Sequence, residues 1–205
     1  MSYIRKIPSK INGTLEITWL HGKKVLNSAK ANYSYGSLQR TLDDGLSNIY
    51  FDSKAKVLVL GMGGGSVIDT LRNKYNHSGH ITAVEIDPVI IEVAKVEFKI
   101  TEHKNLSIIS DNALHFVSNI QSSFDLIIID LFIDMEVPID FYETRFWDSV
   151  ILLIKSKGTV LFNAGIHLRD NTNLQSIIAR YTDTIEFQIY DNIQGTNTLL
   201  IGRKK

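Results

Sequence analysis

The sequence predicts an α/β protein with a doubly wound, mostly parallel sheet of seven strands, preceded by a small N-terminal β-hairpin. From residue 54 onward, short apolar runs typical of buried strands alternate with segments that have helical periodicity. Repeated strand–helix units of this kind join parallel strands through crossover connections. The last two strand segments have no helix between them, so we expect them to pair antiparallel.

The hairpin is the first element in the chain. Residues 14–20 alternate apolar and polar side chains, a His-Gly pair at 21–22 forms the turn, and residues 23–26 return. The strand at 14–20 is expected to present a free edge. A free edge is a surface on which a second copy can pair, so the hairpin is a candidate homodimer contact.

The elements of the sheet follow in order. Strands are predicted at residues 57–60, 81–84, 106–109, 125–130, 159–163, 184–190 and 198–202, and helices at 37–47, 66–75, 88–98, 113–119, 142–154 and 174–180. The segment 57–60 is apolar throughout, as expected of a strand buried on both faces. Pro88 suits the first turn of a helix, where its missing N–H is not needed.

Composition excludes several classes of protein. The 205 residues include 22 basic and 22 acidic side chains and no cysteine. No disulfide scaffold, thiolate zinc site or cysteine nucleophile is therefore available, and no histidine pair has metal-ligand spacing, so we expect no metal. The zero net charge predicts no general attraction to nucleic acid. No apolar run approaches the ~20 residues of a membrane span, and no signal peptide is apparent, so we expect a cytoplasmic protein without membrane contact.

A glycine-rich loop follows the strand at 57–60. Gly61, Gly63 and Gly65, with Met62 among them, connect this strand to the next helix. Glycines let the backbone approach a ligand closely, and the helix N-terminus offers free N–H groups. In an open α/β sheet, ligands bind at the carboxyl ends of the strands. The loop therefore predicts a nucleotide or nucleoside site.

Two acidic residues at the ends of the next strands narrow the class of ligand. Glu85, followed by Ile86, can accept hydrogen bonds from both hydroxyls of a ribose. Asp111, followed by Asn112, is placed to read an adenine amino group, although a helix cap is an alternative role. A dinucleotide and a sulfonium nucleoside both remain open. The dinucleotide is less favoured, because its fingerprint requires a third Gly or Ala where the chain has Ser66.

A further carboxylate ends the fourth predicted strand of the sheet. Asp130 follows an apolar run, so its side chain is expected to face the cleft as a general base or as a partner for a cationic substrate. Asp134 lies close behind it and is a candidate substrate contact. Six acidic residues between Asp125 and Glu143 precede Arg145, which favours a small-molecule acceptor that is cationic or bears an amine.

These segments resemble the spermidine synthase (polyamine aminopropyltransferase) family, within the class I S-adenosylmethionine-dependent methyltransferase fold, which is Rossmann-like. The resemblance is carried by VLVLGMGGGSV at 57–67, AVEIDPVIIEVAK at 83–95, SDNALHFV at 110–117, FDLIIID at 124–130 and FYETRFWDSVILLIKSKGTVLF at 141–162. It extends over nearly the whole chain, including the N-terminal hairpin and NYSYGSLQR at 32–40.

The resemblance implies roles for several residues. The three glycines of the loop would line the S-adenosyl nucleoside, Glu85 would hold its ribose, and Asp111 would bind its adenine amino group. Asp130 would be the catalytic carboxylate, and Tyr35 would lie in the substrate pocket. The family also implies a homodimer. On this basis we divide the chain into an N-terminal hairpin extension, residues 1–36, and a nucleoside-binding catalytic domain, residues 37–205.

The chain departs from the family at positions that bind the diamine. Gly64 stands where the family has an Asp that contacts the aminopropyl amine of decarboxylated S-adenosylmethionine, and Ile133 stands where its catalytic loop has a second Asp. An ammonium group buried without an anion costs several kcal/mol. We therefore expect methyl transfer from S-adenosylmethionine. Aminopropyl transfer from the decarboxylated form and a non-catalytic nucleoside-binding role are the alternatives.

Overall fold

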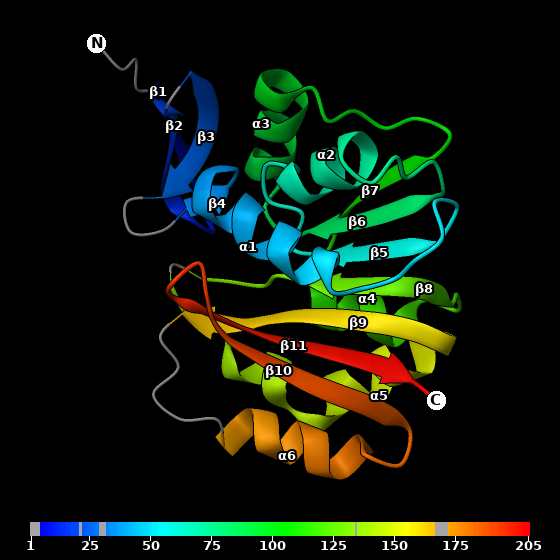
Figure 1. Cartoon of the computed structure of the whole chain (residues 1–205). Helices are drawn as coiled ribbons and strands as arrows, with labels where there is room; N and C mark the ends of the chain where they lie inside the picture. The colour runs from blue at the N-terminus through cyan, green and yellow to red at the C-terminus, as the bar shows by residue number, and fades with distance from the viewer. Residues whose placement is uncertain (1–4, 21, 29–31, 134, 167–171) are drawn as a thin grey trace.

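The structure, a computed structural model, describes residues 5–20, 22–28, 32–133, 135–166 and 172–205. Its strands form two sheets (Figure 1). The N-terminal sheet is antiparallel, with the order β1-β2-β3-β4. The larger sheet has seven strands in the order β10-β11-β9-β8-β5-β6-β7, and this sheet carries the helices.

The bounds of the elements are as follows. The strands are β1 (Arg5–Ser9), β2 (Gly13–Leu20), β3 (Lys23–Ser28), β4 (Asn32–Ser34), β5 (Val57–Leu60), β6 (Ile81–Glu85), β7 (Leu106–Ser110), β8 (Phe124–Ile129), β9 (Ile154–Ile166), β10 (Ile185–Ile193) and β11 (Asn197–Lys204). The helices are α1 (Gly36–Ser47), α2 (Ser66–Asn73), α3 (Pro88–Phe98), α4 (Ala113–Asn119), α5 (Thr144–Leu153) and α6 (Thr172–Tyr181), and Ile139–Tyr142 forms the short 3-10 helix η1.

The larger sheet is covered by helices on both faces. Val57 and Val59 of β5 pack with residues of α1, α2 and α3 in one core cluster. Leu58 and Leu60 pack with α4, α5 and α6 in the other. Because successive side chains of a strand point to opposite faces, a central strand between two helical layers must be apolar at every position. The run VLVL at β5 has this property.

The predicted fold class is confirmed. Each predicted strand and helix of the larger sheet is present, with shifts at the ends. β5, β6, β7, β8 and β9 are parallel, and β11 pairs antiparallel with both β9 and β10, as expected for the last two strands. β9 is much longer than the predicted 159–163. Helix α5 begins later than the predicted 142, because residues up to Tyr142 belong to the tighter helix η1.

The N-terminal sheet contains the predicted hairpin, formed by β2 and β3, and adds a strand on each side of it. The prediction that residues 14–20 present a free edge is wrong. β1 pairs along this strand from Arg5↔Ile17 to Ser9↔Gly13, so β2 is an internal strand. β1 escaped prediction because it is short and contains Pro8, which is typical of an edge strand.

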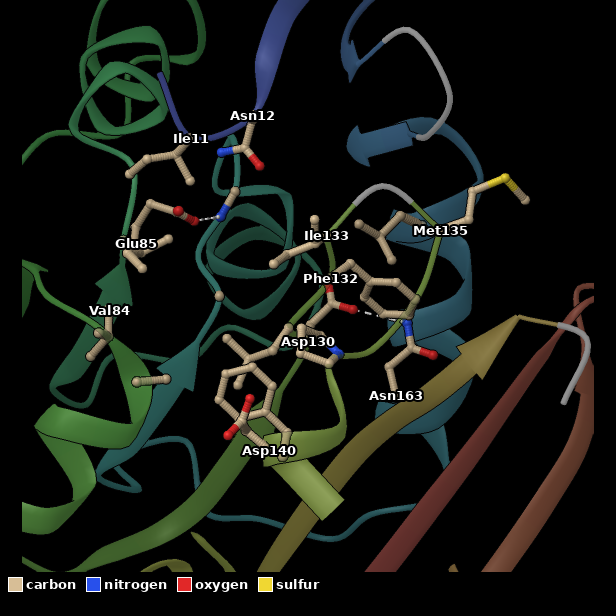
Figure 2. A pocket seen from close by; sticks show the side chains of 18 of the residues that line it. Ile11, Asn12, Val84, Glu85, Asp130, Phe132, Ile133, Met135, Asp140 and Asn163 are labelled. Carbon is tan, nitrogen blue, oxygen red and sulfur yellow. Dashed lines mark hydrogen bonds between the residues drawn. The ribbon is translucent and has the colours of Figure 1, made fainter. Parts of the chain in front are cut away.

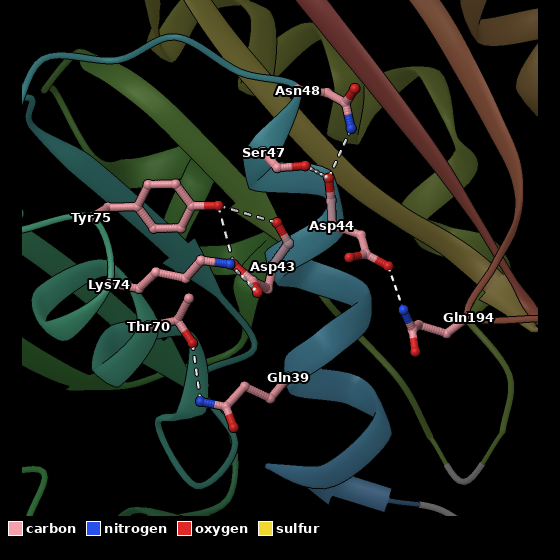
Figure 3. Close-up of polar contacts among 9 residues, drawn as sticks. All are labelled: Gln39, Asp43, Asp44, Ser47, Asn48, Thr70, Lys74, Tyr75 and Gln194. Atoms are coloured by element: carbon pink, nitrogen blue, oxygen red, sulfur yellow. Dashed lines mark hydrogen bonds and ion pairs between the residues drawn. The ribbon is translucent and has the colours of Figure 1, made fainter.

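Helix α1 connects the two sheets. Polar contacts join it to α2, to the residues after α2 and to the turn between β10 and β11 (Figure 3). Gln39 Nε2 donates to Thr70 Oγ1 of α2 at 3.1 Å, and Asp43 accepts hydrogen bonds from Lys74 Nζ at 2.6 Å and Tyr75 Oη at 3.1 Å. Gln194, in the turn between β10 and β11, donates to the Asp44 carboxylate.

Within the described ranges, no helix has the length and apolar character that crossing a bilayer requires.

Candidate functional site

A cavity of about 460 Å³ opens at the carboxyl ends of the parallel strands, and Figure 2 shows it from close by. Seven of the residues predicted from the sequence line it together: Gly61, Gly63, Glu85, Ile86, Asp111, Asn112 and Asp130. The chain passes from β5 to β6 and β7 on one side, and returns to β8 and β9 on the other. The cavity therefore lies at the switch point of the sheet, where open α/β sheets bind ligands.

The glycine loop brings two strands into close contact at the floor of the cavity. Gly61 has a φ of +84°, and a Cβ at this position would lie 2.1 Å from the backbone oxygen of Asp130. Gly63 also has a positive φ, of 54°, and donates its N–H to Glu85 Oε2 at 2.9 Å. Glycine is required at position 61, since no other residue tolerates both the backbone conformation and the contact.

Glu85, at the end of β6, is buried and held by backbone donors. Its Oε2 accepts from Gly63 N, and its Oε1 accepts from Asp87 N at 3.0 Å. Burial raises the pKa of Glu85, and the backbone hydrogen bonds from Asp87 and Gly63 oppose that rise. A carboxylate has about four acceptor sites, so the backbone N–H groups of Gly63, Ile86 and Asp87 leave capacity for a further donor. A hydroxyl of a ribose would supply that donor.

Ligand binding and helix capping are the two roles predicted for Asp111, and in the structure the cap of the helix is another residue. Asn112, not Asp111, is the N-cap of α4, and its Oδ1 accepts from Leu114 N at 2.8 Å. Asp111 instead holds His115, whose Nδ1 lies 2.8 Å from Asp111 Oδ2. The carboxylate of Asp111 also lines the cavity, so it remains available to an exocyclic amine.

Asp130 follows β8 and lies at the centre of the cavity (Figure 2). Its Oδ1 accepts a hydrogen bond from Asn163 Nδ2 at 2.9 Å. The pKa of Asp130 is raised to about 7, chiefly because burial removes the carboxyl group from water; the hydrogen bond from Asn163 lowers the pKa, and the charge of Glu85 raises it. A carboxyl group with a pKa near neutrality can take up and release a proton under ordinary conditions, as a general base must.

The amide of Asn163 belongs to a chain of hydrogen bonds that the sequence did not reveal. Asn163 Oδ1 accepts from Asn197 Nδ2 at 3.0 Å, and Asn197 Oδ1 accepts from Thr196 Oγ1 at 2.8 Å. Asn163 and Asn197 are both buried. A usable signal existed at Asn163, since it is the last residue of the apolar strand predicted at 159–163, just as Asp130 is the last residue of the strand predicted at 125–130. Asn197 reaches the site only because β11 lies beside β9, which local sequence does not show.

Four other predicted residues do not reach the cavity or cannot be placed. Met62 packs into the core cluster that contains α1, α2 and α3. Gly65 is the N-cap of α2, and a Cβ there would meet Ile100 Cγ1 at 2.5 Å. Tyr35 stacks on Phe98 with ring centroids 4.6 Å apart, which keeps it away from the cavity lining. Asp134 lies outside the described residues.

The outer wall of the cavity is formed by the segment after β8 and by the turn between β1 and β2. Apolar side chains dominate it: Ile11, Leu131, Phe132, Ile133, Met135, Pro138 and Phe141. Asp140 also lines the cavity and is paired with Arg145 Nη2 at 2.6 Å. In the β1–β2 turn, Ser9 and Asn12 both bind the Asp87 carboxylate, and Asn12 Nδ2 donates at 2.7 Å.

Comparison with known proteins shows two kinds of relative. A segment of 103 residues is 34% identical to the "eEF1A lysine and N-terminal methyltransferase homolog" of Drosophila pseudoobscura pseudoobscura, covering 49% of this chain and 15% of that protein. A segment of 122 residues is 28% identical to the polyamine aminopropyltransferase of Vibrio vulnificus, covering 58% of this chain and 40% of that protein. The chain thus spans less than half the length of either relative.

Structural comparison supports the same fold. Human Methyltransferase-like protein 13, solved in complex with S-adenosylhomocysteine, aligns with a TM-score of 0.69 at 22% identity, over 83% of each chain. The family model of the spermine/spermidine synthase domain matches residues 45–193, which is well over half of the chain. The chain therefore belongs to the spermine/spermidine synthase domain family.

Proposed function

We propose that this protein is an S-adenosylmethionine-dependent methyltransferase that acts on an amine-bearing acceptor. The observation that carries the proposal is the meeting of Glu85, Asp111 and Asp130 in one cavity beside the glycine loop. We assign nucleoside binding to Gly61, Gly63, Glu85, Ile86, Asp111 and Asn112, and catalysis to Asp130. These residues lie in the proposed catalytic domain, residues 37–205, and the N-terminal sheet closes one side of the cavity.

The residues present fit an S-adenosyl nucleoside. Glu85 retains acceptor capacity for a ribose hydroxyl, and Asp111 offers an acceptor for the adenine amino group. The apolar side chains of Ile86 and Leu114 also line the cavity and suit a flat, weakly polar base. The complex of the human methyltransferase with S-adenosylhomocysteine supports this class of ligand.

Asp130 would act on the acceptor amine. When bound, the nucleoside supplies a methyl carbon to which the amine lone pair bonds, while the C–S bond breaks with its electrons on sulfur. Asp130 would take the proton that the amine must lose to expose its lone pair. Asn163 fixes one carboxylate oxygen of Asp130, so the other is left to face the acceptor. The main contribution of the chain is therefore orientation plus one proton transfer.

The surroundings of Gly64 favour methyl transfer over aminopropyl transfer. A Cβ at this position would lie 2.8 Å from Ser34 Cβ, so β4 occupies the space that a carboxylate side chain would need. No anion can then extend from position 64 toward the bare amine of a decarboxylated nucleoside. The matched family and the Vibrio relative favour aminopropyl transfer, which we keep as the second candidate.

Titration calorimetry with purified protein tests the proposal. S-adenosylmethionine and S-adenosylhomocysteine should both bind, and the decarboxylated form should bind more weakly. Glu85→Gln should reduce the affinity for S-adenosylhomocysteine by about 10- to 100-fold, because a hydrogen bond to a charged group contributes ~1.5–3 kcal/mol.

The matched control is Glu92→Gln, which changes an exposed carboxylate on α3 outside the cavity. It should leave the affinity unchanged. Binding of the decarboxylated form alone, with turnover of putrescine, would establish aminopropyl transfer instead. No binding of any S-adenosyl nucleoside would overturn both functions.

A further inference from the structure

We propose that the acceptor carries a single amine on an apolar stem, with its nitrogen at Asp130 and its stem along the apolar outer wall. This inference rests on the proposed function and adds the chemical class of the acceptor. A free alkylamine and a polypeptide amine flanked by apolar side chains share this chemistry.

The charge distribution in the cavity is the first argument. The charged side chains among its described lining residues are Glu85, Asp111, Asp130 and Asp140, all of them acidic. An anionic acceptor would meet only repulsion there, whereas a cation would be attracted. The cavity therefore selects for a positively charged or amine-bearing molecule.

The partners of these carboxylates show where the amine can bind. Glu85 is held by backbone N–H groups, Asp111 by His115, and Asp140 by Arg145. Asp130, like Glu85, has only uncharged partners, but backbone N–H groups hold both oxygens of Glu85, whereas the amide of Asn163 holds one oxygen of Asp130. Among the described lining residues, Asp130 is thus the carboxylate best able to pair with an ammonium group.

The wall beyond Asp130 determines what the rest of the acceptor can be. Phe132, Ile133, Met135 and Pro138 line the cavity with apolar side chains, and Figure 2 shows Phe132 and Ile133 near Asp130 and Met135 farther out. Ile133 and Met135, which line the cavity, remain 60% and 46% exposed. An apolar stem would cover them, whereas a second ammonium group would lose water there, and Asp140, the carboxylate that the described part of this wall offers, is already paired with Arg145.

Binding of simple amines to the protein saturated with S-adenosylhomocysteine tests this inference without requiring turnover. Butylamine, hexylamine and octylamine should bind with affinity that increases about three- to fourfold per methylene group, as expected for burial of an apolar chain. Hexamethylenediamine should bind at least about tenfold more weakly than hexylamine, because its second charge must lie against the same wall.

Two variants at equally exposed positions distinguish an effect of the cavity wall from an effect of any new surface charge. Ile133 and Ile139 are both 60% exposed, but Ile133 lines the cavity and Ile139 does not. Ile133→Glu should remove the dependence on chain length and should strengthen diamine binding. Ile139→Glu should change neither. Because both positions are on the surface, neither substitution threatens folding.

The source of the amine is distinguished by a further arm of the experiment. A short peptide with a free N-terminal amine and apolar first residues is compared with the same peptide acetylated at its N-terminus. Binding of the free form only, more tightly than octylamine, would identify a polypeptide acceptor, and the reverse order would identify a free amine. Stronger binding of hexamethylenediamine than of hexylamine by the unmodified protein would overturn the inference, even with nucleoside binding intact. Failure of S-adenosylhomocysteine itself to bind would instead overturn the proposed function.

Discussion

At the scale of single residues, Asp130 is subject to opposing influences. Removal from water favours its protonated form, and the amide of Asn163 favours its ionised form. Thr196 donates to the amide oxygen of Asn197, and Asn197 in turn donates to the amide oxygen of Asn163. The N–H₂ group of Asn163 is therefore the part of its amide that faces Asp130. The protonation state of Asp130 is therefore set partly by residues that never touch the acceptor.

We predict that Asn163→Leu shifts the pH dependence of transfer to higher pH. The unmodified protein should gain activity as the pH rises through about 7, the pKa of Asp130. Loss of the hydrogen bond that favours the ionised carboxylate should move this midpoint upward by about one to two pH units. The measurement is the rate of S-adenosylhomocysteine formation as a function of pH.

Thr198→Val is the control for this experiment. Thr198 is also buried on β11, but its hydroxyl donates to Asp191 Oδ1 at 3.0 Å and takes no part in the chain to Asp130. It should leave the midpoint unchanged. An unchanged midpoint in Asn163→Leu as well would show that the amide does not influence Asp130.

A second prediction at this scale concerns Gly61. Gly61→Ala should destabilise the protein by more than about 2 kcal/mol, because the new Cβ would overlap the backbone oxygen of Asp130 and adopt a left-handed conformation. Gly195 has a similar φ of +79° with no atom within 4 Å of its Cβ position. Gly195→Ala should therefore show the conformational cost alone, about 1 kcal/mol, when both are measured by urea denaturation. Equal losses of stability in the two variants would mean that the backbone at Asp130 moves away from the new Cβ at little cost.

The predicted site residues that line the cavity differ from those that do not in where they stand relative to the strands. Glu85, Asp111 and Asp130 each end a strand in a parallel sheet, so their meeting follows from topology. Met62 and Gly65 were grouped with the cavity because they belong to the glycine loop, yet one faces the core and the other caps a helix. Local sequence places a loop at a site, but it does not show which side chains of the loop face inward.

At the scale of elements, the β1–β2 turn is connected to the part of the cavity near Glu85, where we propose that the nucleoside binds. Asp87 caps α3 through Val89 N at 2.9 Å, and the same carboxylate binds Ser9 and Asn12 of the turn. Ile11 and Asn12 line the cavity, whereas Asp87 does not. Asp87 therefore stabilises part of the cavity wall from outside the cavity. The N-terminal sheet thereby contributes to the shape of the site.

We predict that Asp87→Ala weakens nucleoside binding as well as stability. Loss of the cap should cost about 1 kcal/mol, and release of the turn should lower the affinity for S-adenosylhomocysteine severalfold. The control is Glu97→Gln, which removes the pairing of Glu97 with Arg5 and Lys24 between the same helix and sheet, away from the cavity. That variant should lose stability only. Equal affinity in both variants would contradict the role of the turn.

The elements of the larger sheet could be predicted because their periodicity is strong. Apolar runs flanked by turn residues mark every parallel strand, and Pro88 marks the start of α3. β1 and β4 have five and three residues and mostly polar side chains, so they are strands because a neighbour pairs with them. The pairing of β1 also explains why the exposed edge expected at residues 14–20 does not exist.

At the scale of the whole molecule, the raised pKa of Asp130 affects stability. Its ordinary value of 3.8 applies to the unfolded chain, and its value in the folded protein is about 7. Between these values the folded protein keeps a proton that the unfolded chain releases. The free energy of unfolding should therefore decrease as the pH rises from about 4 to about 7, by up to ~4 kcal/mol from this group.

Asp130→Asn should abolish transfer and yet stabilise the protein at pH values above about 7. Asparagine carries no charge to bury, and its Oδ1 can still accept from Asn163. The gain in melting temperature over the unmodified protein should be largest at alkaline pH and should vanish below about pH 4. A gain that is independent of pH would show that Asp130 is not the group responsible.

The position of β11 has a consequence for how the site is assembled. This strand is the last of the described elements, yet it lies between β9 and β10 and supplies Asn197 to the chain that ends on Asp130. Until β11 has left the ribosome, β9 and β10 have no partner between them, and such unpaired edges invite aggregation. Insertion of a central strand after its neighbours is also a non-local step, which slows folding. The surroundings of Asp130 are therefore among the last parts of the described sheet to form, and a chain that stalls before β11 would expose the edges of β9 and β10 without completing them.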